Sequence, residues 1–364
     1  MVVGNGLRYA GVPDVRITVL IPAHNEEHRI GAALAALSRQ TRRPDSVIVI
    51  ADNCTDDTAK VAAAWRAEVA VTVGNTDKKA GALNQVLADI LPRLRDHDFV
   101  LVQDADSQLG EQFVEAALEH MDARPELGAV GGVFQGEPGA GLVGYLQRNE
   151  YARYARDVRR LGGKCLVVTG TAAMMRAGTL KHLSRARLDR TVPAGDGRGG
   201  IYDTTVLTED NELTFALLHL GYEVLSPKEC TLVTEVMPTW RDLWKQRLRW
   251  KRGAVENCFQ YGVTSVTWRY WGRQLLTMAG VAVTFIYLTS IAVAIAVDGG
   301  VSLQPVWMAV TGVFVLERVV TVSDRGWRHM AAAATMFELV YDIFLQLVHA
   351  KAYADVILNR ERNW

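Results

Sequence analysis

The sequence predicts an α/β fold in which helices cover both faces of a mainly parallel sheet, followed by helices that lie on or in a membrane. Apolar runs of strand length alternate with segments of helical periodicity through residues 17–135, and these runs are apolar on both sides, as in a sheet buried on both faces. Residues 275–297 form a 23-residue run without a charge, which is long enough to cross a bilayer.

Four strands are expected in the first part of the chain, and a helix follows each of them. The strands are 17–21, 46–52, 69–73 and 99–103, and the helices are 25–40, 56–65, 78–91 and a segment from Glu111. Beyond them, we expect a helix at 142–160, a strand running into a loop at 164–178, a Gly-rich polar loop at 189–200 and a helix at 209–221. In parallel sheets of this kind, ligands bind beyond the carboxyl ends of the strands.

Charge and cysteine content exclude several classes of protein. The 364 residues carry 40 Lys and Arg and 40 Asp and Glu, so no overall charge attracts nucleic acid. The four cysteines are far apart and form no CxxC pair, which argues against a zinc ribbon and a disulfide framework and favours a reducing environment. The first 16 residues lack the apolar run of a secretory signal. We therefore expect the domain that contains the sheet to be cytoplasmic.

Acidic residues follow the predicted strands and precede a predicted helix. Asp52 follows the second strand, Asp104 and Asp106 follow the fourth, and Glu209 and Asp210 begin the helix at 209–221. Taken singly, each has a simpler explanation, such as a turn residue or a helix N-terminal acid. Taken together, they would converge on one edge of the sheet, where carboxylates can bind Mg²⁺ or Mn²⁺ and one can act as a general base.

A basic and aromatic stretch precedes the apolar run. QRLRW (246–250) lies among Trp240, Trp244, Lys245, Lys251 and Arg252. One interpretation is an amphipathic helix on a membrane surface. The other is a surface for a phosphate and a flat sugar ring. Both remain possible on one helix, with Trp240, Trp244 and Lys245 against headgroups and the motif residues at the site.

An ordered series of motifs resembles the inverting family 2 glycosyltransferases, and within them the membrane-embedded, processive branch that includes cellulose, chitin and hyaluronan synthases. The resemblance covers residues 15–255. Its motifs are PAHNEE (22–27), ADNCTDD (51–57), KKAGALN (78–84), DADS (104–107), GTAAM (170–174), TED (208–210) and QRLRW (246–250). It implies a GT-A fold, which is Rossmann-like, and an enzyme that transfers a sugar from a nucleotide-sugar, usually a UDP-sugar.

The resemblance also implies roles for individual residues. For the donor it implies His24, Glu26 and Asp52 at the base and ribose, Asp104 in contact with the nucleotide and Lys79 near the donor. It also implies Gln246 and Arg249 at the diphosphate, with Asp106 as the ligand of Mn²⁺ or Mg²⁺. For the acceptor it implies Gly170, Thr171 and Trp250, with Asp210 as the catalytic base beside Glu209. The family often has Tyr at the position of His24 and Asp at that of Ala51.

The acceptor class stays open at this point. QxxRW favours a polymerase that extends a poly- or oligosaccharide. The small number of apolar helices favours a transferase that adds one sugar to a lipid or a protein. A non-catalytic membrane scaffold would not need the acidic positions, and a nucleotidyltransferase would need neither TED nor QxxRW. A homo-oligomer is compatible with the sequence, because a pore for a polymer needs many helices.

The chain is expected to divide into a cytosolic GT-A domain (1–238), interfacial helices with QRLRW (239–273), a membrane region (274–358) and a tail (359–364). Residues 275–297 are expected to span the bilayer of an inner or plasma membrane, and 301–322 is a weaker candidate. Residues 330–358 predict a third helix with a polar stripe of Glu338, Asp342 and Gln346. If that helix also spanned, Arg360 and Arg362 would lie outside the cell, so an interfacial or re-entrant position is favoured.

Overall fold

A seven-stranded sheet forms the centre of the protein, whose computed structural model describes residues 15–298, 300 and 305–362. The strand order is β3-β2-β1-β4-β8-β6-β9, and all neighbours are parallel except β8, which runs antiparallel to β4 and β6. The predicted α/β class with a mainly parallel sheet is confirmed. The strands are β1 (Ile17–Ala23), β2 (Ser46–Ala51), β3 (Glu68–Val71), β4 (Phe99–Gln103), β6 (Leu127–Gly131), β8 (Ala172–Arg176) and β9 (Glu223–Leu225).

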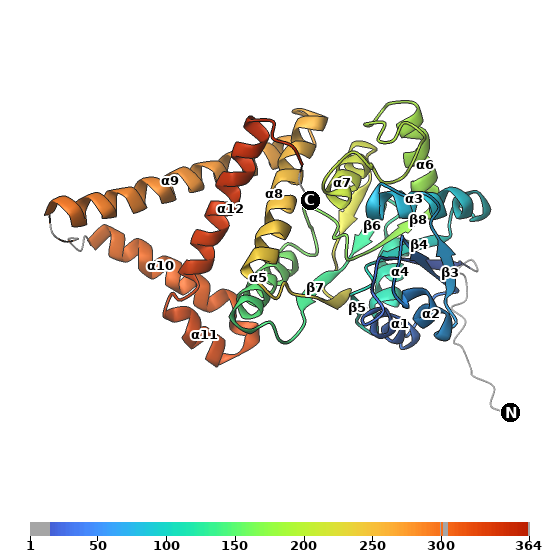
Figure 1. Cartoon of the computed structure of the whole chain (residues 1–364), viewed down its shortest axis with the longest axis horizontal. Helices are drawn as coiled ribbons and strands as arrows, with labels where there is room; N and C mark the ends of the chain where they lie inside the picture. Colours follow the sequence, from blue (N-terminus) through green and yellow to red (C-terminus); the bar gives the residue numbers. More distant parts are fainter. Residues whose placement is uncertain (1–14, 299, 301–304, 363–364) are drawn as a thin grey trace.

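Helices cover both faces of this sheet (Figure 1). Side chains alternate along β1, so Val19 and Ile21 enter one hydrophobic core while Leu20 enters the other. This is why the strands read as continuous apolar runs. The first core contains residues of α1 (Ile30–Ser38), α2 (Thr58–Ala64) and α4 (Phe113–Ala123); the second contains residues of α3 (Lys78–Ile90), which η1 (Leu91–Arg93) follows, α6 (Ala177–Leu188) and α7 (Glu209–His219).

A second, three-stranded sheet lies beside the large one. Its order is β5 (Gln108–Leu109), β10 (Thr231–Thr234) and β7 (Val133–Gly136), with β10 antiparallel to β5 and parallel to β7. Ser107 directly precedes β5, and its hydroxyl is hydrogen-bonded to the hydroxyl of Thr234, the last residue of β10, at 3.0 Å. This sheet therefore brings Asp106 and Glu235 near each other, although 129 positions separate them in the sequence.

Most predicted elements of the first part of the chain are present. The four strands lie within two residues of their expected bounds, and α5 (Gly141–Arg160) matches the helix expected at 142–160. The helix expected at 25–40 begins only at Ile30, because Asn25 has a φ of 58° and the chain turns there. The prediction for 164–178 was wrong in its order: the loop comes first and the strand, β8, follows. The antiparallel direction of β8 leaves Gly170 and Thr171 at the edge where β4 ends.

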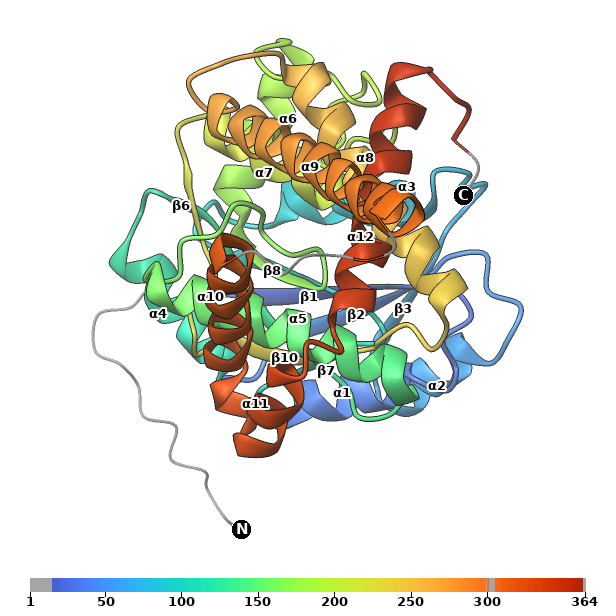
Figure 2. The ribbon, with the colours of Figure 1, turned by 90° about the vertical axis from the view of Figure 1, so that its left-hand side faces the viewer.

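The C-terminal part is helical and extends away from the sheets. It contains α8 (Trp240–Tyr261), α9 (Trp268–Asp298), α10 (Pro305–Thr321), η2 (Ser323–Arg325), α11 (Trp327–Ala334) and α12 (Leu339–Ile357). α9 projects outward and α10 returns toward the sheets, while α12 packs along α8 (Figures 1 and 2). α8 also packs on α7, so it lies between the sheet domain and α12.

One helix within the described residues is long and apolar enough to cross a membrane. It is Trp268–Val297, which contains the predicted span at 275–297, and 6% of its most apolar window is buried. The candidate at 301–322 lies partly outside the described residues, and its described helix, α10, has 17 residues.

The helix predicted at 330–358 is not continuous. It is broken between α11 and α12, which meet at 71°, and Met336 in the break has a φ of 55°. Taken together, the two helices have the length and composition of a broken span or a re-entrant loop.

Candidate active site

Four segments meet at one edge of the large sheet. β1, β2 and β4 are parallel, so the residues that follow them, from His24, Asp52 and Asp104, emerge at the same edge. β8 enters the sheet from this edge, and the Asp104 amide donates a hydrogen bond to the Thr171 carbonyl at 2.9 Å. The residues expected from the sequence to bind donor and acceptor therefore lie in one region.

Asp52 is held in one orientation by its neighbours. Its Oδ1 accepts hydrogen bonds from the Thr72 hydroxyl at 2.7 Å and from the side-chain amides of Asn75 at 2.8 Å and Asn53 at 3.1 Å. The Nδ1 of His24 lies 2.7 Å from the Asp52 carbonyl oxygen. All three bonds to the carboxylate end on one oxygen, so the fixed group presents Oδ2 for a further donor such as a ribose hydroxyl or a base N–H.

Lys79 connects three of the motifs. Its Nζ contacts Asp104 Oδ1 at 2.5 Å, donates to the Gly170 carbonyl at 2.9 Å and lies 3.7 Å from Glu209 Oε1. Burial by itself would lower the pKa of Lys79, but the Asp104 and Glu209 carboxylates outweigh burial and raise it. Lys79 is therefore a fixed positive charge between the donor residues and the start of α7.

Asp210 lies in the first turn of α7, close to Gly170. Its Oδ2 accepts from the Gly170 amide at 3.1 Å and its Oδ1 from the Asn211 amide at 2.8 Å. A Cβ on Gly170 would lie 3.1 Å from Oδ2, a tight contact that would require the Asp210 side chain to move by a few tenths of an ångström. Burial and the neighbouring Glu209 carboxylate raise the pKa of Asp210 to about 6, although Lys79 and Arg249 oppose the rise. At neutral pH the group is an ionised carboxylate with greater basicity than an exposed aspartate.

Acidic side chains gather around Asp106. Burial and the Asp104 carboxylate raise the pKa of Asp106 to about 6, and burial and Asp106 raise that of Glu26 to about 7. Glu235 contributes to both shifts, and its partner is Arg29 at 2.6 Å. Glu26 therefore belongs to the group of carboxylates around Asp106, rather than to the group that holds Asp52.

The residues around Asp106 fit a divalent cation that is completed by substrate. Within the described part of the chain, no three His, Cys, Asp or Glu side chains are arranged to hold a metal ion by themselves. The crowded carboxylates offer hard oxygen ligands and repel one another, as their raised pKa values indicate. Mg²⁺ is commonly held by one or two carboxylates together with substrate phosphates.

α8 places the QRLRW residues beside α7. The Arg249 guanidinium donates to the Leu207 carbonyl at 3.3 Å, just before the TED motif. Gly253 packs so closely on Thr208 that a Cβ would lie 2.5 Å from its hydroxyl oxygen, and the Asn257 amide donates to that hydroxyl at 3.1 Å. Gln246 accepts a hydrogen bond from Arg247 at 3.0 Å, and the Trp250 side chain is exposed.

The two other tryptophans of this stretch lie against α12. The Trp240 and Trp244 rings pack on Phe344, with centroids 4.9 and 5.7 Å apart. Both are partly buried, whereas Lys245 is exposed. The tryptophans thus join two helices of the protein.

Two further residues at the site were not found from the sequence. Tyr202 is 4% exposed, and burial together with the Glu209, Asp210 and Asp104 carboxylates raises the pKa of its hydroxyl despite the opposing charge of Lys79. The side chain of Asn84 makes two hydrogen bonds, of 2.8 and 2.9 Å, with the backbone of Tyr202. The second residue that the sequence did not reveal is Glu235. It directly follows β10 and lies 129 positions after Asp106. Its only signal is that it follows a short apolar strand, as Asp52 and Asp104 do.

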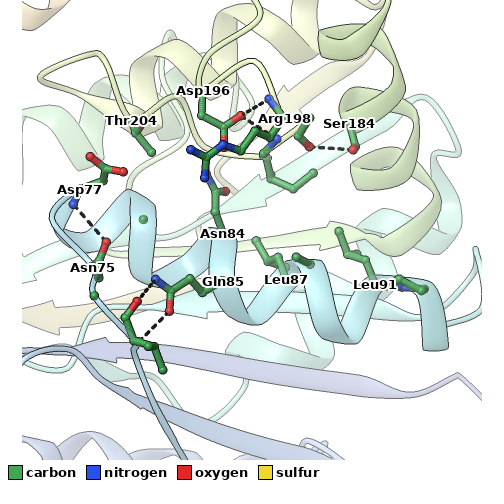
Figure 3. A pocket seen from close by; sticks show the side chains of 18 of the residues that line it. Asn75, Asp77, Asn84, Gln85, Leu87, Leu91, Ser184, Asp196, Arg198 and Thr204 are labelled. Atoms are coloured by element: carbon green, nitrogen blue, oxygen red, sulfur yellow. Dashed lines mark hydrogen bonds between the residues drawn. The ribbon is translucent and has the colours of Figure 1, made fainter.

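A cavity of about 870 Å³ opens beside this site, not in it (Figure 3). α3 forms one wall with Asn84, Gln85 and Leu87, and the Gly-rich loop expected at 189–200 forms the opposite wall with Asp196 and Arg198. Its lining includes Asn75, which bonds to Asp52, but none of the predicted catalytic or metal-binding residues.

Comparison with known proteins identifies the sheet domain. Residues 18–184 match the family model "Glycosyl transferase family 2". Over these residues, just under half of the chain, the sequence is similar to the family 2 glycosyltransferases. The match agrees with the family and with the enzyme class, a glycosyltransferase, that the motifs predict.

Curated relatives of the chain include two poly-beta-1,6-N-acetyl-D-glucosamine synthases. The protein from Staphylococcus epidermidis is 24% identical over 250 residues, and that from Staphylococcus aureus (strain COL) is 25% identical over 246 residues. Each match covers 66% of this chain and 55% of the relative. The chain thus spans about half the length of the curated relatives it matches.

A solved structure shares the fold of the protein. The mannosyltransferase from Pyrobaculum calidifontis, in complex with GDP-Man and Mn²⁺, superposes with a TM-score of 0.59 at 18% identity. The match covers 95% of this chain and 88% of that protein. The likeness confirms the predicted GT-A fold.

Proposed function

We propose that the protein is a membrane-associated inverting glycosyltransferase that moves a sugar from a nucleotide-sugar to a hydroxyl of a growing poly- or oligosaccharide. The observation that carries the proposal is the junction of Lys79, Gly170 and Asp210. It puts a fixed cation and a carboxylate of raised basicity within one hydrogen-bonded group at the carboxyl edge of the sheet. This combination suits a reaction in which a diphosphate leaves and a hydroxyl loses its proton.

The donor lies, in this proposal, along the ends of β1, β2 and β4. His24 and Asp52 contact the base and ribose, and the fixed orientation of the Asp52 carboxylate supports this role. Asp104 contacts the nucleotide, with Lys79 at its side. Glu26 was expected at the base or ribose, but its acidic surroundings favour a place nearer the diphosphate.

Asp106 would hold Mn²⁺ or Mg²⁺, with substrate oxygens completing the site. When bound, the cation would neutralise charge on the departing diphosphate. Gln246 and Arg249 of α8 contact the same diphosphate, so positive charge faces it from two sides. The carboxylate crowding around Asp106 supports a cation at this position.

Asp210 acts as the general base toward the acceptor. It removes the proton of the acceptor hydroxyl as the oxygen forms a bond to C1 of the donor sugar and the bond from C1 to the diphosphate oxygen breaks. Attack comes from the face opposite the diphosphate, so the configuration at C1 is inverted. Glu209 keeps Asp210 basic, Gly170 and Thr171 line the acceptor side, and Trp250 offers a ring face to the acceptor sugar.

The first donor to test is UDP-N-acetylglucosamine, because the curated relatives are named as synthases of an N-acetylglucosamine polymer. GDP-mannose is a second, because it is bound in the solved mannosyltransferase that shares the fold. A single-sugar transferase acting on a lipid or protein remains the second candidate function. It is favoured by the small number of spans in the described residues, one helix and one bent pair.

The membrane association rests on α9 and on the bent pair of α11 and α12. Eleven large apolar side chains of α9 between Leu275 and Val297 are exposed, and the helix projects away from the sheets (Figure 1). The proposed division keeps residues 1–238 as a cytoplasmic catalytic domain, 239–273 as a connecting region and 274–358 in or on the bilayer. α8 occupies the connecting region, and its Trp240 and Trp244 pack on α12.

Product size tests the proposal. The full chain would be purified in detergent and incubated with Mn²⁺ and radiolabelled UDP-N-acetylglucosamine, UDP-glucose or GDP-mannose. A ladder of products would establish a polymerase, whereas one added sugar on a co-purifying acceptor would establish the second candidate. Asp210→Asn should abolish either product, and the exposed Asp89→Asn serves as the matched control that keeps it. No transfer and no nucleotide release from wild type with any donor would refute the proposal.

A further inference from the structure

The orientation of the Trp250 ring depends on one cation of the same motif. The ring is 36% exposed, and the Cζ of Arg247 lies 4.4 Å from its centroid. A guanidinium at this distance stacks on an indole face through a cation–π contact. One face of the ring is therefore covered by protein, and a sugar can stack only on the other.

Arg247 itself is fixed from several directions. It is 5% exposed, donates to Glu150 Oε2 at 2.8 Å and to Gln246 Oε1 at 3.0 Å, and lies 5.7 Å from the Tyr151 ring. Burial alone would lower its pKa, but the Glu150 carboxylate outweighs burial and raises it, so the guanidinium stays charged. A charged, enclosed arginine with a carboxylate partner has little freedom to change its orientation.

The carboxylate that holds Arg247 also receives a bond from α12. Glu150 lies on α5, and its Oε2 accepts from the Tyr341 hydroxyl at 2.5 Å. Three helices thus meet at this one oxygen: α5 of the sheet domain, α8 with QRLRW, and α12 of the C-terminal helices.

We propose that Arg247 is a positioning residue that sets the plane of Trp250 for the acceptor sugar, and that Glu150 links this setting to α12. The inference rests on the proposed function, because it concerns the acceptor side of the same reaction. Arg249, the other arginine of the motif, faces α7 instead and donates to the Leu207 carbonyl. The two arginines of QRLRW therefore have separate tasks, one toward the donor and one toward the ring.

Kinetics with separate donor and acceptor titrations test the proposal. The probes are UDP-N-acetylglucosamine, or whichever donor the wild type uses, and an oligosaccharide of the transferred sugar. Arg247→Gln should raise the acceptor KM about 3- to 30-fold, the range of a cation–π contact, and change the donor KM less. Arg241→Gln, an exposed arginine on the same helix, is the matched control and should change neither.

A double-mutant cycle distinguishes positioning from general damage to the fold. If Arg247 acts through the ring, Arg247→Gln adds no further loss to Trp250→Ala; independent roles would multiply the two losses. Glu150→Gln, which keeps Arg247, gives a second route and should raise the acceptor KM in the same direction. Tyr341→Phe should do so by a smaller factor, because only a bond from α12 is lost.

The outcomes separate this inference from the proposed function. An active wild type with an unchanged acceptor KM in both Arg247→Gln and Glu150→Gln would overturn the positioning role alone. Multiplied losses in the double variant would do the same. A wild type that transfers no sugar to any acceptor would overturn both proposals together. A melting temperature for each variant within a few degrees of wild type keeps the comparison valid.

Discussion

The basicity of Asp210 predicts how activity changes with pH. The base must be ionised to accept a proton, and the pKa of Asp210 is raised to about 6. For that pKa, the carboxylate fraction is about 97% at pH 7.5 and about 9% at pH 5. We therefore expect kcat to fall about 10-fold between these values, with the midpoint near pH 6. Asp210→Asn should lower kcat at pH 7.5 by at least about 100-fold, the contribution of a positioned general base.

The assay is initial-rate sugar transfer at saturating donor and Mn²⁺, from pH 5 to pH 8. Saturation matters because the pKa of Asp106 is also raised to about 6, so metal binding weakens over the same range. The residual rate of Asp210→Asn should be flat with pH. An acid limb that persists in Asp210→Asn at saturating Mn²⁺ would assign the titration to another group and refute the reasoning.

Stability provides an independent check on the same variant. Because the folded pKa of Asp210 lies above its ordinary value of 3.8, the folded state binds the proton more tightly than the unfolded state does. Its contribution to stability is therefore present below pH 3.8 and is lost as pH rises through about 6. At pH 7.5, Asp210→Asn removes a disfavoured charge, so its melting temperature should not fall. Lost activity with an unchanged or higher melting temperature would separate catalysis from folding.

Three other predictions concern the metal, the core and the membrane. Asp106→Asn should lower kcat about 100-fold or more and weaken Mn²⁺ binding, which electron paramagnetic resonance of free Mn²⁺ measures in the presence of the nucleotide. The Arg187–Glu212 ion pair has no exposed side-chain surface, so Glu212→Gln should lower the free energy of unfolding, measured in urea, by about 3–5 kcal/mol. Lys60→Ala, at an exposed ion pair, should not change it measurably. Ile286→Arg, near the middle of α9, should make the free energy of membrane insertion less favourable by about 2.5–3.5 kcal/mol. It should therefore shift protein from the membrane fraction to the soluble fraction, whereas Ile286→Leu should not. Unchanged Mn²⁺ binding, unfolding midpoint or fractionation, respectively, would contradict each prediction.

The first part of the fold was predictable because its signals are local. A strand buried on both faces is apolar at almost every position, as 17–21 and 99–103 are except at Thr18 and Gln103, and its bounds follow from where that run stops. The second sheet was not predicted, because β5, β7 and β10 have two to four residues each and gain their order from pairing across the chain. The order of loop and strand at 164–178 was mispredicted for the same reason. An apolar run shows a strand, but its partners decide where it begins.

The site was predictable where a strand end carries its chemistry. Asp52, Asp104 and Asp106 follow apolar runs directly, so sheet geometry brings them together. Glu235 and Tyr202 depend on long-range packing, through the Ser107–Thr234 bond and the Asn84 clamp, and no sequence spacing reports either. Likewise, the break between α11 and α12 lies in a run of good helix formers, and only a left-handed backbone at one residue marks it.

The basic and aromatic stretch left two interpretations open, a membrane surface or an active-site surface, and α8 shows why one helix can look like both. Trp240 and Trp244 pack on Phe344 of α12, so their apolar surface binds another helix of the protein. Further along α8, Arg247 lies 5.7 Å from the Tyr151 ring of α5, and Gly253 packs on Thr208 of the TED motif. α8 thus contacts α12 along its length, through Phe344 near its start and Tyr353 near Lys251, and it contacts the residue just before Glu209 and Asp210. The helix that packs on α12 is therefore the same one that packs on Thr208 and the start of α7, where the proposed base lies.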